Sequence, residues 1–205
     1  KLPDEFNYIH IFKQIADEPK TGHGEAALTD LAQTFENRRQ YPRAAEFWRR
    51  NIKEHGPGQS NWKQARLDQI VGNWGRFEPL VTQPAGKGAT IDFRFRNGNK
   101  VVLEAHEIKV EKLLHDVKAY LKAKPAQVDW RQVNIGDLGY RLVQENQKQY
   151  VGAKVAGWDL ALEPREQHFD KRITIATPLQ KAGAYLVSPR WPTAMSARSS
   201  YGSVI

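Results

Sequence analysis

Any chemistry in this sequence must come from histidines, acids and hydroxyls, because the 205 residues include no cysteine. The lack of cysteine excludes disulfides, thiolate nucleophiles and cysteine-bound zinc. The six histidines are His10, His23, His55, His106, His115 and His168. They form no His-Glu-x-x-His motif, and no two of them lie four residues apart on a helix. We therefore expect no metal site and no cofactor.

One pair of residues could support a hydrolase. His168 and Asp170 lie two residues apart in HFDKR, so on a strand their side chains would share one face. A hydrolase also needs an activated nucleophile, and the sequence has no Gly-x-Ser-x-Gly motif. The serines of RSSYGS lie in a tail without periodicity. We interpret His168 and Asp170 as anchors for the start of a strand and keep a hydrolase as an alternative.

The charge pattern argues against nucleic-acid binding, although the formal net charge is +8. Lysines and arginines are interleaved with acids, as in HEIKVEKLLHDVK, and no arginine-rich arm is present. The glycine clusters GPGQS and GKG lack the Lys-Ser/Thr of a phosphate loop. The sequence contains no run of about twenty apolar residues, which a membrane-spanning helix would need. We therefore expect that the chain does not bind nucleic acid and has no membrane-spanning segment.

Two of the six tryptophans are candidates for a partner surface. Trp130 and Trp191 lie in irregular segments with polar neighbours, and an exposed tryptophan is a common anchor of a protein interface. Trp48 and Trp158 fall in phase with apolar neighbours and are expected in the core. Trp62 and Trp74 flank the point where the hydrophobic period changes.

Residues 1–73 have the 3.6-residue period of helices. Two successive faces are separated by the break QYP, and their apolar residues are Leu28, Leu31, Ala32 and Phe35, then Tyr41, Ala44, Ala45 and Trp48. The hairpin resembles a tetratricopeptide repeat, in which small residues such as Ala32 and Ala44 let two helices approach closely. It departs from that pattern at Asn51 and Gly56. One repeat is fewer than the three or so that a free solenoid needs, so we expect a short helical segment.

After Trp74 the period changes to two, which predicts strands. Residues 91–95 alternate between apolar and polar, Asn97-Gly98 predicts a hairpin turn, and residues 101–105 would return along the partner strand. An amphipathic helix is expected at about 109–124. Further strands are expected in YVGAKVAGWDLALEP, RITIATP and AYLVSP. Short strands separated by turns predict an antiparallel sandwich with one inserted helix.

The segment PLQKAGAYLV is typical of a sandwich corner. Leu179 precedes an Ala-Gly turn at Gly183, and Tyr185 then enters an apolar strand. In such corners the tyrosine hydroxyl binds the backbone a few residues upstream. We expect these three residues to have a structural role.

The order of the segments between residues 88 and 188 resembles the macroglobulin-type β-sandwich of bacterial alpha-2-macroglobulin-like proteins. The quoted stretches are GATIDFRFRNGNKVVLEAHEI, VEKLLHDVKAYLK, YVGAKVAGWDLALEP and HFDKRITIATPLQKAGAYLVS. The resemblance implies an α+β chain of TPR-like helical hairpins (1–73), an immunoglobulin-like or macroglobulin sandwich with one inserted helix (74–188), and a tail or linker (189–205).

The same resemblance implies a role without catalysis. The chain would be a scaffold or interaction module of a large periplasmic or secreted protease inhibitor. Its partners would be other domains of the same parent chain, a protease or a cell-envelope protein. A protein-binding adaptor of the cell envelope, with no link to protease trapping, is the alternative function.

Overall fold

The computed structural model describes residues 7–18, 22–79, 82–124, 126–134, 142, 147–192 and 203–204. Helices form the N-terminal part, and two antiparallel sheets with an inserted helix follow. The α+β class predicted from the change of hydrophobic period is confirmed. The N-terminal helices are α1 (Tyr8–Asp17), α2 (Gly24–Asn37), α3 (Tyr41–His55) and α4 (Trp62–Val71), with the short 3-10 helix η3 (Gln59–Asn61) before α4.

The predicted helical hairpin is formed by α2 and α3. Ala32 and Ala44 are fully buried between them, which allows the close approach expected from their size. Pro42 lies in the first turn of α3, where its missing N–H leaves no bond unmade. Gly56 ends that helix with a positive φ of 78°. Helix α1 packs on α2 and α4 packs on α3, so all four helices share one apolar core.

The strands form two sheets. The first has the order β1-β2-β5, and the second has the order β4-β3-β6-β7, with every neighbouring pair antiparallel. The short strand β1 was not predicted from the sequence. The strands are β1 (Trp74–Phe77), β2 (Thr90–Arg96), β3 (Lys100–Ile108), β4 (Val151–Ala161), β5 (Lys171–Ala176), β6 (Tyr185–Arg190) and β7 (Ser203–Val204).

The predicted hairpin through Asn97-Gly98 is wrong. Strand β2 pairs with β1 and β5, whereas β3 pairs with β4 and β6, so the turn carries the chain from one sheet to the other. Both strands have one fully apolar face, and stacking the sheets buries the two faces against each other. Their inward residues, Ile91, Phe93 and Phe95 on β2 and Val101, Leu103 and Ala105 on β3, belong to one buried cluster.

The C-terminal part of the sandwich extends further than expected. Strand β6 runs to Arg190, and Trp191 is packed in the sandwich core with only 8% of its surface exposed. The sandwich therefore continues past the boundary expected at residue 188. Trp191 was expected to be exposed, and that expectation is wrong because its ring fills the space above two glycines. A Cβ added at Gly98 would lie 2.1 Å from the Trp191 ring, and one at Gly75 would lie 3.0 Å from it.

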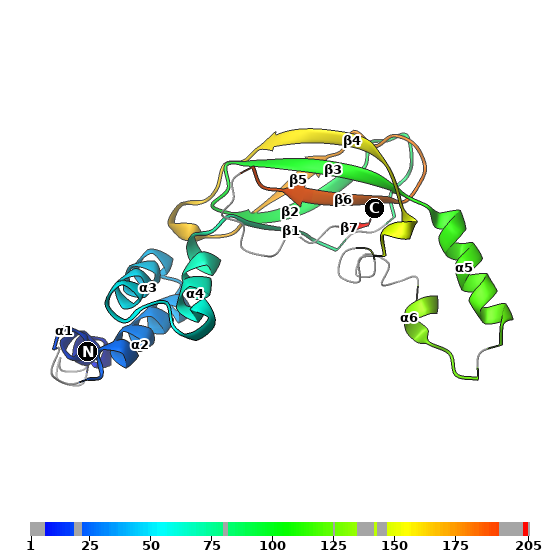
Figure 1. The fold of residues 1–205 in the computed structure, drawn as a ribbon. Coiled ribbons are helices and arrows are strands. Elements are labelled where there is room, and N and C mark those ends of the chain that lie inside the picture. Colours follow the sequence, from blue (N-terminus) through cyan, green and yellow to red (C-terminus); the bar gives the residue numbers. More distant parts are fainter. Residues whose placement is uncertain are drawn as a thin grey trace.

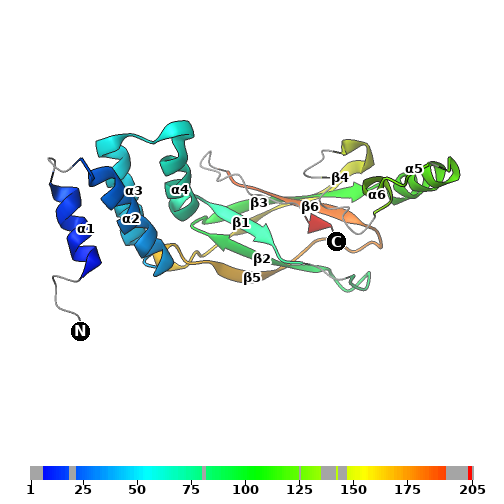
Figure 2. The same ribbon diagram turned by 90° about the horizontal axis from the view of Figure 1, so that it is seen from below.

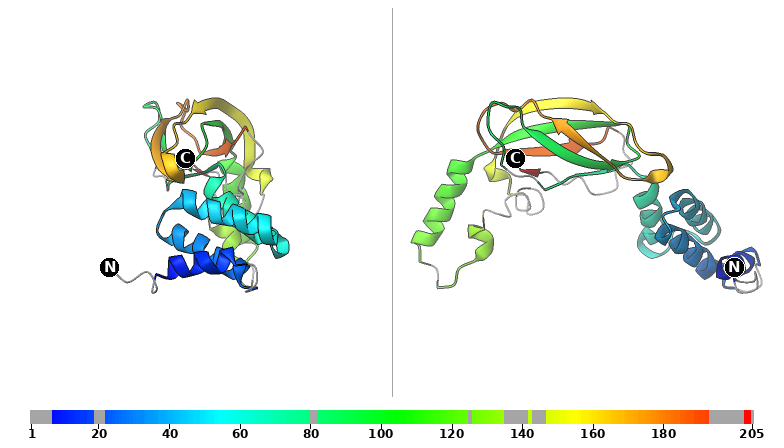
Figure 3. Two further views of the ribbon diagram at one scale, coloured as in Figure 1. Left: turned by 90° about the vertical axis from the view of Figure 1, so that its left-hand side faces the viewer. Right: turned by 180° about the vertical axis from the view of Figure 1, so that it is seen from behind.

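The molecule is elongated, with the sandwich in the middle (Figure 1). Helices α1–α4 extend from one end of the sandwich, and the inserted helix α5 (Val110–Lys122) extends from the other end with the short α6 (Trp130–Val133). Figure 2 shows the same succession from below, and Figure 3 shows that both helical ends bend to the same side of the sheets. Among the described residues, helix α5 is buried against the sandwich at Leu113, in its first turn.

Candidate functional site

The junction between the helices and the sandwich is organised by Asn97. Its backbone has a positive φ of 61°, which an asparagine tolerates better than most residues. Its side-chain Nδ2 donates to the carbonyls of Ile70, at 2.8 Å, and Gly72, at 2.9 Å. These are carbonyls at the end of α4, which has no further turn to satisfy them. The Asn-Gly pair therefore fastens the helical end to the inter-sheet turn.

His168, which lies shortly before β5, binds the same asparagine. Its Nδ1 lies 2.8 Å from Asn97 Oδ1. Because Nδ2 of Asn97 already donates to the backbone, its Oδ1 must accept, so the imidazole Nδ1 carries the proton. Burial lowers the pKa of His168, and the charges of Arg49 and Arg96 lower that pKa further. A neutral histidine is thus favoured at this position.

Asp170 binds a different partner from His168. Its Oδ1 accepts from Arg96 Nε at 2.8 Å. His168 ends the 3-10 helix η5 (Glu166–His168) with a φ of 62°, so the two residues do not share a strand face as predicted. Strand β5 begins directly after them, at Lys171. The contacts of His168 and Asp170 are those of residues that anchor a strand, and the hydrolase geometry expected from their spacing is not formed.

Aromatic and arginine side chains surround this junction. The Tyr41 ring of α3 meets Phe169 edge to face at a centroid distance of 5.4 Å. The Arg96 guanidinium lies over Tyr41 at 5.9 Å and over Trp74 at 5.6 Å, and its Nη1 donates to Gln69 O at 2.8 Å. Cation–π contacts of this kind each contribute about 0.5–1 kcal/mol at exposed sites. Arg96 therefore connects α3, α4 and β1 at one point.

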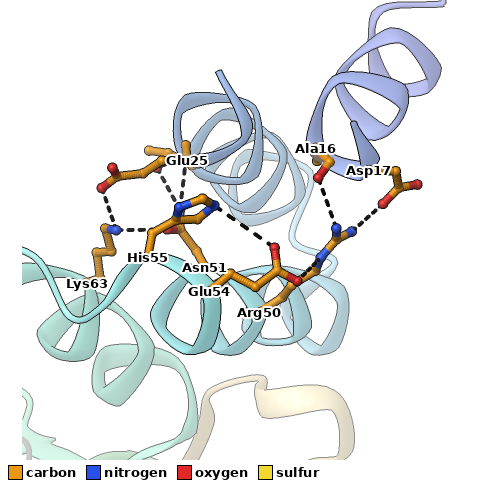
Figure 4. A network of polar contacts seen from close by, with 9 residues as sticks. Ala16, Asp17, Glu25, Arg50, Asn51, Glu54, His55 and Lys63 are labelled. Carbon is orange, nitrogen blue, oxygen red and sulfur yellow. Dashed lines mark hydrogen bonds and ion pairs between the residues drawn. The ribbon is translucent and has the colours of Figure 1, made fainter. Parts of the chain in front are cut away.

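A second polar network lies inside the helical part (Figure 4). The Lys63 side chain is fully buried, and its Nζ contacts Glu25 Oε1 at 2.6 Å and Asn51 Oδ1 at 2.8 Å. Asn51 in turn donates to Glu25 O and to Thr29 Oγ1. The hydrogen bond from Lys63, with its charge, lowers the pKa of Glu25. Asn51 stands where the repeat pattern has a small residue, and this departure was the only sequence signal for the network.

Arg50 forms the neighbouring branch of that network. Its Nη1 donates to Asp17 Oδ1 at 2.7 Å, and its Nη2 donates to Ala16 O at 3.1 Å, both at the end of α1 (Figure 4). Its Nε donates to Glu54 one turn along α3. The hydrogen bonds that Arg50 donates to the carboxylates of Glu54 and Asp17 raise the pKa of Arg50. Arg50 thus binds one backbone carbonyl and one carboxylate at the end of α1 and connects that helix to α3.

The predicted corner residues lie at the opposite end of the sandwich. Tyr185 Oη donates to Lys181 O at 3.1 Å, four residues upstream. A Cβ added at Gly183 would lie 3.1 Å from that hydroxyl, so a larger residue would press on it. Leu179 and Tyr185 are both in the sandwich core cluster. This geometry suits a structural role for the three residues.

Trp130 is the most exposed large apolar side chain in the described part of the chain, with 75% of its surface accessible. It begins α6, beside the projecting helix α5. Tyr120 of α5 holds this segment, because its Oη accepts from the amide of Asp129 at 2.7 Å. Of the two tryptophans expected at a partner surface, only Trp130 is accessible.

The described residues contain no group of three or more histidine, aspartate or glutamate side chains placed to hold a metal ion. Among them, no helix has both the length and the apolar character needed to cross a membrane. Of the polar residues that the sequence singled out, His168 and Asp170 bind Asn97 and Arg96 and so connect elements of the fold.

Comparisons with known proteins identify a distant structural resemblance. No family model matches the chain, and no curated protein matches it. The structure is similar to a crystal structure of native alpha-2-macroglobulin from Escherichia coli spanning domains MG0-NIE-MG1, with 15% identity over 66% of this chain and a TM-score of 0.41. A structure spanning NIE-MG1 of the same protein gives 16% identity over 66% of this chain, 60% of that chain and a TM-score of 0.40. The match covers 38% of the MG0-NIE-MG1 chain.

Proposed function

We propose that this chain is a non-enzymatic scaffold and interaction module of a large extracytoplasmic alpha-2-macroglobulin-like protease inhibitor. The observation that carries the proposal is the junction around Asn97. Its amide binds two carbonyls at the end of α4 and the imidazole of His168, and so fastens the helical part to both sheets. The helical part is thereby held in one position relative to the sandwich, which is what a spacer between other domains requires.

In this role the partners are other domains of the same parent chain, and a protease meets the assembled molecule. The polar side chains that could have served catalysis support the proposal, because they are used structurally. His168 binds Asn97, and Asp170 binds Arg96. The extracytoplasmic location is part of the proposal, and the resemblance of residues 88–188 to macroglobulin-type sandwiches supports it.

The test is whether the complete gene product stops a protease from cleaving a large protein substrate. We expect the complete product to block cleavage of a protein substrate while a small peptide substrate is still cleaved, and this chain alone to block neither. Replacing Asn97 by Ala in the complete product should weaken the block, and replacing the exposed Lys53 by Ala should not. Protease activity left unchanged by the complete product would contradict the proposal. So would peptide or ester hydrolysis by this chain that is lost in His168→Ala.

An adaptor of the cell envelope is favoured by one specific observation, the exposure of Trp130. A tryptophan that is solvated in the free protein is a common hot spot of a protein interface. If the chain is an adaptor, cross-linking in cells should attach it to a separate envelope protein, and Trp130→Ala should abolish that product. Attachment only to domains of its own parent chain would favour the scaffold instead.

A further inference from the structure

The projecting helix α5 and the segment that follows it carry exposed apolar side chains. We call residues 109–130 the α5 arm. Leu113 is buried beside Tyr150 and Leu186, but Leu114 and Leu121 on the same helix are 37% and 48% exposed. Val110, Val128 and Trp130 are exposed as well. The arm therefore presents more aliphatic and aromatic surface than its contact with the sandwich uses.

The arm carries more basic than acidic residues. Residues 109–130 include five lysines, three acids and no arginine, a net charge of +2. One of the acids, Asp116, is already bound by Lys112 at 3.0 Å and by the hydroxyl of Tyr150 at 3.1 Å. Lys118 and Lys122 are exposed, and neither forms an ion pair among the described contacts.

Two lysines of the helix lie beside the apolar stripe. At 100° per residue, Lys118 lies about 40° and Lys122 about 80° beyond Leu114, on one side of the stripe. Flexible lysine side chains beside an apolar stripe can reach outward to anionic headgroups while their methylene stems cover apolar surface. This is the pattern of a helix that lies in a membrane interface.

The composition favours a lipid surface over a protein partner. Protein interfaces are enriched in arginine and depleted in lysine, and arginine is the residue suited to paired recognition of carboxylates. The arm has only lysine between residues 109 and 124. It also has Trp130, and tryptophan is enriched at the level of lipid headgroups.

The position of the arm allows contact with a flat surface. Helix α5 and α6 extend away from the sheets at the end opposite to helices α1–α4 (Figures 1 and 3). Tyr120 holds the segment before α6 by accepting from the amide of Asp129, so Trp130 stays next to the helix.

We propose that the α5 arm binds the surface of an anionic lipid membrane, with its apolar stripe inserted between headgroups and its lysines bound to phosphates. The proposal is independent of the scaffold function. A chain that binds lipid but belongs to no inhibitor would keep this inference and remove the other.

The test is partitioning of the purified chain between buffer and large vesicles. Vesicles of equal parts phosphatidylglycerol and phosphatidylcholine should bind the chain, and vesicles of phosphatidylcholine alone should bind it weakly or not at all. The double variant K118E/K122E should reduce binding by tenfold or more, since each basic residue near an anionic surface contributes roughly a fivefold gain. Higher salt should weaken binding in the same direction.

A matched control separates a local surface from net charge. K13E/K53E makes the same change of charge at exposed lysines of α1 and α3, and it should leave most of the binding intact. L114S/L121S should weaken binding, while I11S/V155S, at exposed apolar positions elsewhere, should not. Circular dichroism of each variant verifies the fold.

Three results would overturn the proposal. One is the absence of binding to anionic vesicles by the unaltered, folded chain. Another is an equal loss of binding in K13E/K53E and K118E/K122E, which would show attraction by net charge alone. The third is an α5 arm that captures an acidic protein partner from the same compartment while vesicles containing phosphatidylglycerol bind nothing.

Discussion

The two cores of this protein are built in different ways. The core of the helical part surrounds a fully buried lysine whose charge is matched by Glu25 and Asn51. The sandwich core is a cluster of aliphatic and aromatic side chains, with Phe93 packed on Phe95, Phe77 and Trp191. A buried charge makes a core depend on a few exact partners, whereas an apolar core depends on volume. Removing a buried side chain should therefore lower the stability of the two parts for different reasons: lost volume in the sandwich and an unpaired charge in the helical part.

The largest effect is expected in the sandwich. Phe93→Ala should lower the free energy of unfolding by about 4 kcal/mol, because it removes a fully buried ring and leaves a cavity among three aromatic neighbours. Segment-resolved hydrogen exchange in a urea series should show the strands opening first while α2 and α3 stay protected. Phe93→Leu, which keeps most of the volume, is the control and should cost much less. Equal loss of protection in strands and helices would show that the two cores unfold as one unit.

The two parts also differ in how far the sequence could predict them. The hairpin of α2 and α3 follows from local information, because helix period, the break at Pro42 and the small residues Ala32 and Ala44 lie within 30 residues. The sheets do not. Strand β2 pairs with β5 some 80 residues later, as in the pairing of Asp92 with Thr174. Alternation shows which face of a strand is buried but not which strand lies beside it, so the Asn-Gly turn predicts a hairpin that the fold does not form.

The candidate site shows the same limit. Trp130 and Trp191 look alike in sequence, since both follow polar residues in irregular segments. Trp191 is buried because Gly75 and Gly98, distant in the chain, leave room for its ring. Lys63 has no sequence mark of burial at all, because its partners are 12 and 38 residues away. Only contacts made by the complete fold decide such positions.

The next effect tests the buried charge. Asn51→Ala should lower the free energy of unfolding by about 3 kcal/mol, because it removes the only amide that bridges Lys63 and Thr29 and leaves a buried ammonium short of an acceptor. The double variant N51L/K63M should cost less than Asn51→Ala, since it leaves no unpaired charge inside. A double-mutant cycle with Lys63→Met measures the coupling. Strictly additive effects would refute the interpretation that the two residues act together.

A smaller effect is expected at the junction that connects the two parts. Asn97→Ala should cost about 2 kcal/mol, since it removes two hydrogen bonds to the end of α4 and places a Cβ residue without a helpful side chain at positive φ. Asn97→Gly relieves the backbone and should cost roughly half as much. Urea unfolding with probes in each part should show the two transitions moving apart in both variants. Coincident transitions in Asn97→Ala would mean that other contacts join the parts.

The smallest effect concerns protonation at the same junction. The pKa of His168 is lowered from 6.5 by burial and by Arg49 and Arg96, so the unfolded chain binds a proton more readily than the folded one. The stability contribution of the neutral imidazole is therefore fully present above pH 6.5 and is lost as the pH falls from there through the lower pKa of the folded state. His168→Gln keeps an amide donor for Asn97 but does not titrate. Urea unfolding of both proteins over this range should give free energies that converge or cross as the pH falls, because only the unaltered protein loses the His168 contribution. Parallel curves would mean that protonation of His168 costs the folded chain no more than the unfolded chain, and the junction would then be insensitive to acid.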